Sequence, residues 1–510
     1  MKRIVRNDTV LIFLTLLLAY VYVLPRWADW SQTSRLNLVR ALVERGTVRI
    51  DDYLRNTGDY ALIDGHAYTD KAPGPSLMGL PVYLLVYPIL QQPFINERLE
   101  RLATGGALGG TLNPQGTGLN SDKVRDFVSQ FLLTLTVIAF PSALAGVVLY
   151  QFLALFGAGR IPRLLTTLAY GLATPAATYA GNFYSHQLVG SLCLIAFALI
   201  AWLARGEGGW PRALLAGLLM GFVVISEYPA ALTVAAIGIY AIVCVPRKVL
   251  WIVLGGALPV GLMVVYDMVA FGTPIPVGYS HSALWQNQHS TGFMSITYPH
   301  AEALWGLTFG DFRGLFVRAP WLVLSIPGLV LWWRSRTLRA EWFVTVCAAS
   351  GITLFYSSSV MWWGGFAAGP RYIVPAIPFL AVAAFPAVVA LWNLRQPTAA
   401  LGARIGLVLL TIMAAIITWV EGTASQSFPV DTIRNTWDGY VFPAWQRGDI
   451  ARNAGTLLGL HGGMTLLPLV ITLTALIVWM VTRGRESDTP QPVPTSAAER
   501  SKRQVPADRF

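Results

Sequence analysis

The chain has 510 residues, of which 55% are hydrophobic and only 12% are charged, with a net charge of +11. A soluble domain carries about 25% charged residues, so this composition excludes a soluble globular enzyme. It predicts an all-α, polytopic membrane protein with about 12 transmembrane helices, each about 17–25 residues long. The positive charge gathers in short loops between apolar runs, where it reports topology, and we expect no nucleic-acid partner.

The first predicted element is an N-terminal anchor span, residues 1–25. Lys2, Arg3 and Arg6 precede the apolar run Thr9–Leu24, and no small-residue cleavage site follows it. We therefore expect an uncleaved span whose N-terminus lies in the cytoplasm.

A long first outer loop, residues 26–126, should follow. Apolar residues recur at helical spacing between Ser34 and Arg45, with charged residues on the other faces, which predicts a juxtamembrane amphipathic helix lying at the membrane surface. Residues 76–90 are apolar enough to cross the membrane, but a crossing there would put the next basic loops outside. We interpret them as a juxtamembrane or re-entrant helix.

The multi-span region covers residues 127–482, with further outer loops at 271–318, 359–372 and 421–463. After the anchor, its expected spans are 127–156, 164–182, 187–204, 213–228, 229–246, 249–270, 319–333, 342–358, 373–392, 406–420 and 464–482. The short basic loops between them should be cytoplasmic. Residues 483–510 are polar and Pro-rich, typical of a disordered cytoplasmic tail.

Three ionisable residues stand at predicted outer mouths or loop edges: Asp70, His186 and Glu227. An ionisable group at membrane depth is by default a functional candidate, although Glu227 and His186 could instead satisfy backbone groups at helix ends. Together the three are candidate ligands of a divalent metal ion (Mn²⁺, Mg²⁺ or Zn²⁺), since imidazole favours a transition metal over Ca²⁺. Glu227 alone is a candidate catalytic base.

Outer arginines form a second group of candidates: Arg35, Arg40, Arg313, Arg318 and Arg371. Arg35, Arg40 and Arg371 can bind phosphate bidentately, and Lys71 can add a point charge. Trp362 and Trp363 precede Arg371 in a turn-rich segment and could offer aromatic surfaces to a sugar or a lipid headgroup, although tryptophan is common at any membrane interface.

The chain resembles the type C glycosyltransferases, and most closely the aminoarabinose-transferase and protein-mannosyltransferase branch (family 39-like). The resemblance rests on the order of first span, Arg-bearing helix, Tyr68-Thr69-Asp70-Lys71-Ala72-Pro73 and many spans, over about residues 9–210. In that family a Tyr-x-Glu-Lys-Pro element closes the first outer loop, and its acidic-basic pair contacts metal or lipid phosphate. The resemblance gives these roles to Asp70 and Lys71.

The chain departs from the family at the catalytic base. The family has an Asp-Glu pair just after the first span, where this chain has Ser31-Gln32, and the nearest acid is Asp29. A second family acid falls where this chain has Ser185-His186. Asp29, Asp70, His186 or Glu227 could supply the base, or the activity could be lost.

The resemblance therefore implies an integral plasma-membrane glycosyltransferase with cytoplasmic termini and an extracytoplasmic active face. It would transfer a sugar from a polyprenyl-phosphate donor to an acceptor, while an acid or histidine takes the acceptor's proton. Membrane lipid and a polyprenyl-phosphate-linked sugar are its expected partners. The alternative is a non-catalytic transporter or flippase of a lipid-linked saccharide.

Overall fold

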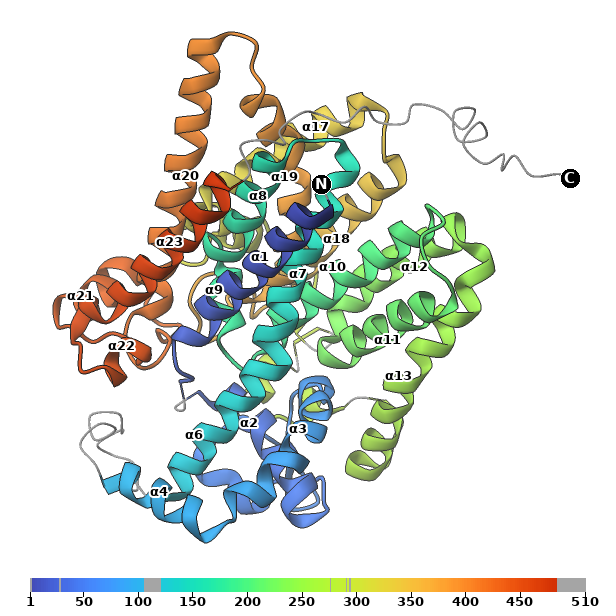
Figure 1. Ribbon diagram of the computed structural model, residues 1–510. Coiled ribbons are helices and arrows are strands. Elements are labelled where there is room, and N and C mark those ends of the chain that lie inside the picture. Colours follow the sequence, from blue (N-terminus) through green and yellow to red (C-terminus); the bar gives the residue numbers. More distant parts are fainter. Residues whose placement is uncertain are drawn as a thin grey trace, which may run out of the picture.

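The computed structural model describes residues 2–26, 29–104, 121–275, 277–289, 291–292 and 295–483. Part of the first outer loop, and the predicted tail from residue 484 onward, lie outside these ranges. Long helices form a bundle, and α2 (Trp30–Arg40), α3 (Gly74–Leu90) and α4 (Pro93–Thr104) gather at one end of it, far from the start of α1 (Lys2–Tyr22) (Figure 1).

Helical segments coincide with every predicted apolar run. They are α1, α6 (Ser121–Leu133), η3 (Thr134–Ala139), α7 (Phe140–Phe152), η4 (Leu153–Phe156), α8 (Arg160–Leu172), α9 (Pro175–Ala180), α10 (Ser185–Leu203), α11 (Trp210–Ser226), η5 (Tyr228–Ala230), α12 (Ala231–Cys244), η6 (Pro246–Lys248), α13 (Val249–Phe271), η8 (Pro320–Leu324), α17 (Ser325–Ser335), α18 (Arg339–Ser357), η9 (Arg371–Ala376), α19 (Ile377–Trp392), α20 (Pro397–Thr423), η11 (Gly462–Leu466) and α23 (Leu467–Thr482).

Within the described residues, 6 helices are long and apolar enough to cross a membrane. Shorter apolar helices cover Asn7–Tyr22, Trp210–Ser226 and Tyr228–Cys244, and α3 with the start of α4 forms a further apolar pair bent by 88°. The helical, membrane-protein character of the chain is thus confirmed, while the count of about 12 spans stays a prediction. The bend in the α3–α4 pair is the geometry of a broken span or a re-entrant segment, the second of which the sequence predicted.

The helix at the start of the first outer loop differs from its prediction. Instead of an amphipathic helix at the membrane surface, α2 is buried on all faces from Ser31 to Val39 and continues into η1 (Ala41–Arg45). Its polar residues are tolerated inside the protein because they find partners there: Ser34 hydrogen-bonds Thr69 at 2.8 Å, and Asn37 donates to Asn56 at 2.7 Å.

The fold is not entirely helical. After η2 (Asp51–Asn56), the first outer loop contains a β-hairpin of β1 (Ala61–Ile63) and β2 (His66–Tyr68). Asp64 and Gly65 both have positive φ, which is the Asp-Gly turn that joins two such strands. Smaller outer elements complete the chain: η7 (Gly278–His281), α14 (Gln286–His289), α15 (Ala301–Thr308), α16 (Leu315–Arg318), η10 (Trp437–Val441), α21 (Phe442–Gln446) and α22 (Ala454–Leu457).

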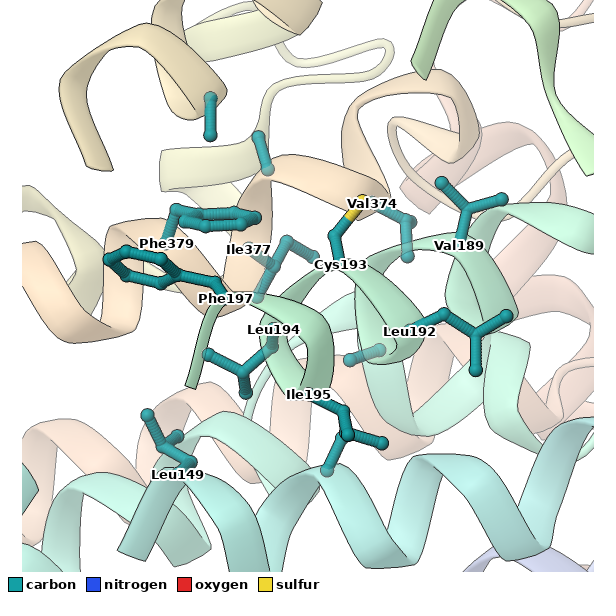
Figure 2. Packing of buried hydrophobic residues seen from close by; sticks show 14 of the residues in the cluster. Leu149, Val189, Leu192, Cys193, Leu194, Ile195, Phe197, Val374, Ile377 and Phe379 are labelled. Atoms are coloured by element: carbon teal, nitrogen blue, oxygen red, sulfur yellow. The ribbon is translucent and has the colours of Figure 1, made fainter. Parts of the chain in front are cut away.

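The core centres on α10, which packs against α7, α11 and η9. Figure 2 shows Cys193 of α10 beside Val374 of η9, and Phe197 beside Phe379 of α19. These residues are buried, and Cys193 is a small core residue, as its apolar sequence context predicts. This packing fixes α10, and with it Ser185 and His186 at its N-terminal end, relative to Arg371 at the start of η9.

Candidate functional site

Two neighbouring cavities lie where the predicted outer segments meet. The larger, the outer cavity, has a volume of about 460 Å³ and is lined by residues that include Asp29, Asp59 and Phe428. The smaller, the inner cavity, measures about 340 Å³ and is lined by residues that include Arg35, His186 and Glu227. Both volumes are typical of small-molecule sites. The two cavities share six lining residues, here called the shared wall: Ser31, Lys71, Tyr279, Met361, Arg371 and Tyr372.

Arg371 is a half-buried cation of the shared wall. Its guanidinium lies 4.8 Å from the ring centre of Tyr184 and 5.5 Å from that of Tyr372. Its Nε is buried and has no hydrogen-bond partner in the described part of the chain. Two aromatic faces therefore hold the guanidinium while a donor remains available for an anion.

Asp29 faces the outer cavity from the start of α2. It is the N-cap of that helix, and its carboxylate accepts a hydrogen bond from the backbone N–H of Ser31 at 3.1 Å. The hydroxyl of Tyr184 and the amide of Gln32 also donate to it. Burial raises the pKa of the Asp29 carboxyl, against the opposing effects of the Tyr184 hydrogen bond and the Arg371 charge. A raised pKa suits a general base working near neutral pH.

Lys71 belongs to a buried acid-base cluster. Its Nζ lies 3.0 Å from Asp59 Oδ2 and 3.1 Å from Asp70 Oδ1, and Ser282 donates to Asp70 at 3.1 Å. Burial alone would lower the pKa of Lys71, but the charges of Asp59 and Asp70 outweigh it and raise that pKa. Lys71 is thus held as a cation in the shared wall. Asp70 forms an ion pair with it but lines neither cavity.

Glu227 occupies the break between α11 and η5 and faces the inner cavity. Ser185 donates a hydrogen bond to its Oε1, which also lies 3.2 Å from His186 Nδ1 and 4.0 Å from Arg35 Nη2. Arg35 in turn donates to Ser185 at 2.9 Å. The carboxylate therefore serves as the counter-ion of a buried cation and as an acceptor for its neighbours, so that its oxygens are largely occupied.

The segment that carries Arg371 is clamped by a second, fully buried arginine. Arg313 donates to the backbone carbonyls of Trp363, Gly365 and Ala367 at 3.1, 2.9 and 2.6 Å. These are consecutive turns of the segment before Arg371, where Gly364, Gly365 and Gly369 all have positive φ. Glycine adopts positive φ at little steric cost because it has no Cβ. Arg313 then holds the backbone carbonyls of these turns in place.

Arg313 and Arg318, two of the predicted outer arginines, line neither cavity, and Arg318 forms an ion pair with Glu421 at 2.8 Å. Three other predicted ligand-binding residues do not line either cavity. Arg40 forms ion pairs with Glu44 at 2.9 Å and with Asp126 at 2.5 Å. Trp363 donates to Asp431 at 3.0 Å, and Trp362 packs edge-on against Phe312. All three help to shape the walls, while their neighbours Met361, Gly365 and Phe366 form the lining.

The predicted metal ligands are only partly brought together. His186 and Glu227 face each other, but Asp70 lies in the separate cluster with Lys71. Among the residues that the structure describes, no group of three or more His, Cys, Asp or Glu side chains is placed to hold a metal ion. The donor set therefore does not fit the expected metal site, and we assign no step to a metal.

Sequence reasoning missed the residues that hold the site together. Tyr184 and Tyr372 flank Arg371, Tyr279 completes the shared wall, and Asp59 is the closest partner of Lys71. Tyr372 directly follows Arg371 and Tyr184 lies two residues before His186, and this nearness in sequence was the one available signal. Nothing in the sequence connects Asp59 with Lys71, because a hairpin must form before they meet.

No protein-family model and no curated protein matches the chain. In fold, the chain is similar to the crystal structure of ArnT from Cupriavidus metallidurans bound to undecaprenyl phosphate, with 16% identity and a TM-score of 0.49, covering 94% of this chain and 72% of that one. The apo structure of the same ArnT has 16% identity, a TM-score of 0.45 and the same coverage. Both are aminoarabinose transferases of the type C glycosyltransferases, the family that the sequence resembles, and the likeness is one of fold alone.

Proposed function

We propose that the chain is a membrane glycosyltransferase that moves a sugar from a polyprenyl-phosphate donor to an acceptor hydroxyl on the extracytoplasmic side. The observation that carries this proposal is the shared wall. Arg371, whose buried Nε has no hydrogen-bond partner among the described residues, and the protonated Lys71 face both cavities. Two cations between two cavities suit a phosphate that enters with the donor on one side while the acceptor approaches from the other.

The two cavities differ in the acid that they offer. The inner cavity contains Glu227, already engaged by Ser185 and Arg35, and we assign the lipid-phosphate end of the donor to it. The outer cavity contains Asp29, whose side chain belongs to its lining. Of the candidate bases Asp29, Asp70, His186 and Glu227, Asp29 fits best, because Asp70 lines neither cavity and His186 and Glu227 face each other in the inner one.

The reaction then follows from these positions. Asp29 takes the proton of the acceptor hydroxyl as that oxygen forms its bond to the anomeric carbon of the donor sugar. The bond between the anomeric carbon and the phosphate oxygen breaks, and the polyprenyl phosphate leaves with its negative charge balanced by Arg371 and Lys71. Neutralising charge that develops on a leaving group is an effective use of fixed cations in a partly closed site.

Binding of undecaprenyl phosphate to the purified protein in nanodiscs tests the phosphate site. Arg371→Gln and Lys71→Gln should each weaken binding at least about tenfold, since charge-assisted hydrogen bonds contribute strongly. Lys71→Arg should recover more affinity than Lys71→Gln, because charge is the shared requirement. Arg395→Gln, an exposed arginine in a predicted cytoplasmic loop, is the matched control and should bind as wild type does. If Arg371→Gln and Lys71→Gln both bind undecaprenyl phosphate as tightly as wild type, the shared wall is not the phosphate site.

A further inference from the structure

The outer cavity has a lining that distinguishes it from the inner one. Aromatic side chains stand on its walls and rim, among them Trp30, Trp285 and Phe366, interspersed with the carboxylates of Asp29, Asp59 and Asp126. Trp30 is 44% exposed and Phe366 is 45% exposed, although neither lies on an apolar transmembrane helix. Large aromatic surfaces in a polar cavity are complementary to a ligand with one apolar face and many hydroxyls.

Trp30 is exposed and yet fixed in position. Its ring lies flat against Gly58, where an added Cβ would come within 2.8 Å of it. Its backbone carbonyl accepts a hydrogen bond from Thr57 at 2.9 Å. A rigid aromatic surface costs little conformational entropy when a ligand stacks on it. Trp30 is also the residue next to Asp29, so a ligand stacked on this ring comes close to the proposed base.

Two carboxylates of the outer cavity are already paired with cations of the protein. Asp59 pairs with Lys71, and Asp126 pairs with Arg40. A carboxylate in an ion pair still has lone pairs that can accept hydrogen bonds from hydroxyl groups. A neutral, polyhydroxylated ligand therefore fits these carboxylates better than an anionic one.

We propose that the outer cavity is a saccharide site and that the acceptor of the transfer is a carbohydrate hydroxyl; this inference rests on the proposed function. The C–H face of a sugar ring packs on Trp30, because the face of an aromatic ring carries the negative part of its quadrupole. The sugar hydroxyls donate to the carboxylates beside it, and the hydroxyl nearest Asp29 becomes the nucleophile. A peptide acceptor would offer one hydroxyl and few such donors.

The test measures binding of methyl α-D-mannopyranoside, methyl β-D-glucopyranoside, maltotriose and a blocked Gly-Thr-Gly peptide to the full chain in nanodiscs by saturation-transfer NMR. At least one saccharide should bind, with the strongest transfer to its ring C–H protons. Trp30→Ala and Phe366→Ala should each raise its Kd at least about tenfold, in line with the loss of an aromatic contact in a site. Trp305→Ala is the control, because Trp305 is 62% exposed and lines neither cavity.

Several outcomes would overturn the inference. They are binding of the peptide without any saccharide, no saccharide binding at all, or equal saccharide affinity in Trp30→Ala and wild type. Undecaprenyl phosphate binding, measured on the same samples, separates this failure from that of the proposed function. If no saccharide binds but undecaprenyl phosphate still binds in an Arg371-dependent way, only the saccharide-site proposal is rejected. Trp30-dependent saccharide binding without lipid-phosphate binding removes the transferase proposal.

Discussion

The guanidinium of Arg371 lies 4.8 Å from the ring centre of Tyr184, and the hydroxyl of that tyrosine donates a hydrogen bond to Asp29. One aromatic side chain thus connects the proposed phosphate-binding cation with the proposed base. The three residues come from the N-terminus of α2, the residue before α10 and the start of η9. In the proposed reaction the base acts on the attacking hydroxyl, and the cation acts on the phosphate that leaves the same anomeric carbon.

Substitution of each acid should show whether Asp29 or Glu227 is the catalytic base. Asp29→Asn keeps the size of the side chain but removes the proton acceptor, so kcat should fall by about 10²–10⁴-fold, the usual contribution of a general base. Undecaprenyl phosphate binding should stay within about threefold of wild type, because Asp29 does not face the inner cavity.

Glu227→Gln should behave in the opposite way. The amide oxygen can still accept from Ser185, but the charge that balances Arg35 at 4.0 Å is lost. We expect weaker donor binding, seen as a KM raised about tenfold, with a kcat within about tenfold of wild type. Abolished turnover in Glu227→Gln with active Asp29→Asn would make Glu227 the base.

The pH dependence of kcat/KM should reflect the ionisation of the Asp29 carboxyl. The base works only when ionised, and burial raises its pKa, so kcat/KM should fall on the acid side at a higher pH than a surface aspartate, with its ordinary pKa of about 3.9, would produce. Tyr184→Phe removes a hydrogen bond that stabilises the ionised form, so the pKa should rise further and the acid limb should move to higher pH. Tyr298→Phe changes an exposed tyrosine outside both cavities and should leave the profile in place. An acid limb unmoved by Tyr184→Phe would contradict this assignment.

Arg313 should position Arg371 without touching the ligand. Arg313→Gln leaves buried carbonyls of the preceding turns without a donor, each at a cost of about 1–3 kcal/mol, and should lower the midpoint of thermal unfolding. Undecaprenyl phosphate affinity should fall as well, because Arg371 loses its fixed position. Arg313→Lys should restore part of both losses. Unchanged lipid affinity in a destabilised Arg313→Gln protein would limit Arg313 to a role in stability.

Membrane sidedness can be tested by cysteine labelling in a chain whose Cys193, Cys244 and Cys347 are replaced by alanine. Gly208 and Gly292 have positive φ and are unsuitable positions, so the exposed Glu207 and Ser280 are better ones. An impermeant reagent applied from outside should label Ser280→Cys and not Glu207→Cys. The reverse pattern would invert the topology.

Labelling at Gln92, which lies at the bend between α3 and α4, should show how residues 76–90 run relative to the membrane. If α3 is juxtamembrane, Gln92→Cys should be labelled from outside together with Ser280→Cys. If α3 and α4 form a re-entrant pair whose tip is this bend, Gln92→Cys should stay protected from both sides. Labelling of Ser280→Cys with protection of Gln92→Cys until the membrane is permeabilised would mean that α3 crosses.

The sequence by itself determined the membrane character of the chain and the grouping of its polar segments. Apolar runs of spanning length must satisfy their backbone as helices in lipid, so hydropathy alone predicts them. The outer cavity is lined from all four predicted outer segments: Asp29 and Lys71 from the first, Tyr279 from the second, Arg371 from the third and Phe428 from the fourth. Charge placement had assigned these segments to one side.

Only the tertiary structure decided what each polar residue does there. Arg35, Arg40 and Arg371 have the same side chain, but one pairs with Glu227, one with Asp126 and one stacks on two tyrosines. Composition cannot distinguish them, because the partner of a buried charge comes from another part of the chain. The same holds for α2, whose polar faces indicated a membrane surface until Thr69, Asn56 and Ser185 supplied buried partners. A hydrogen bond depends on position to within a few tenths of an ångström, and folding alone sets that position.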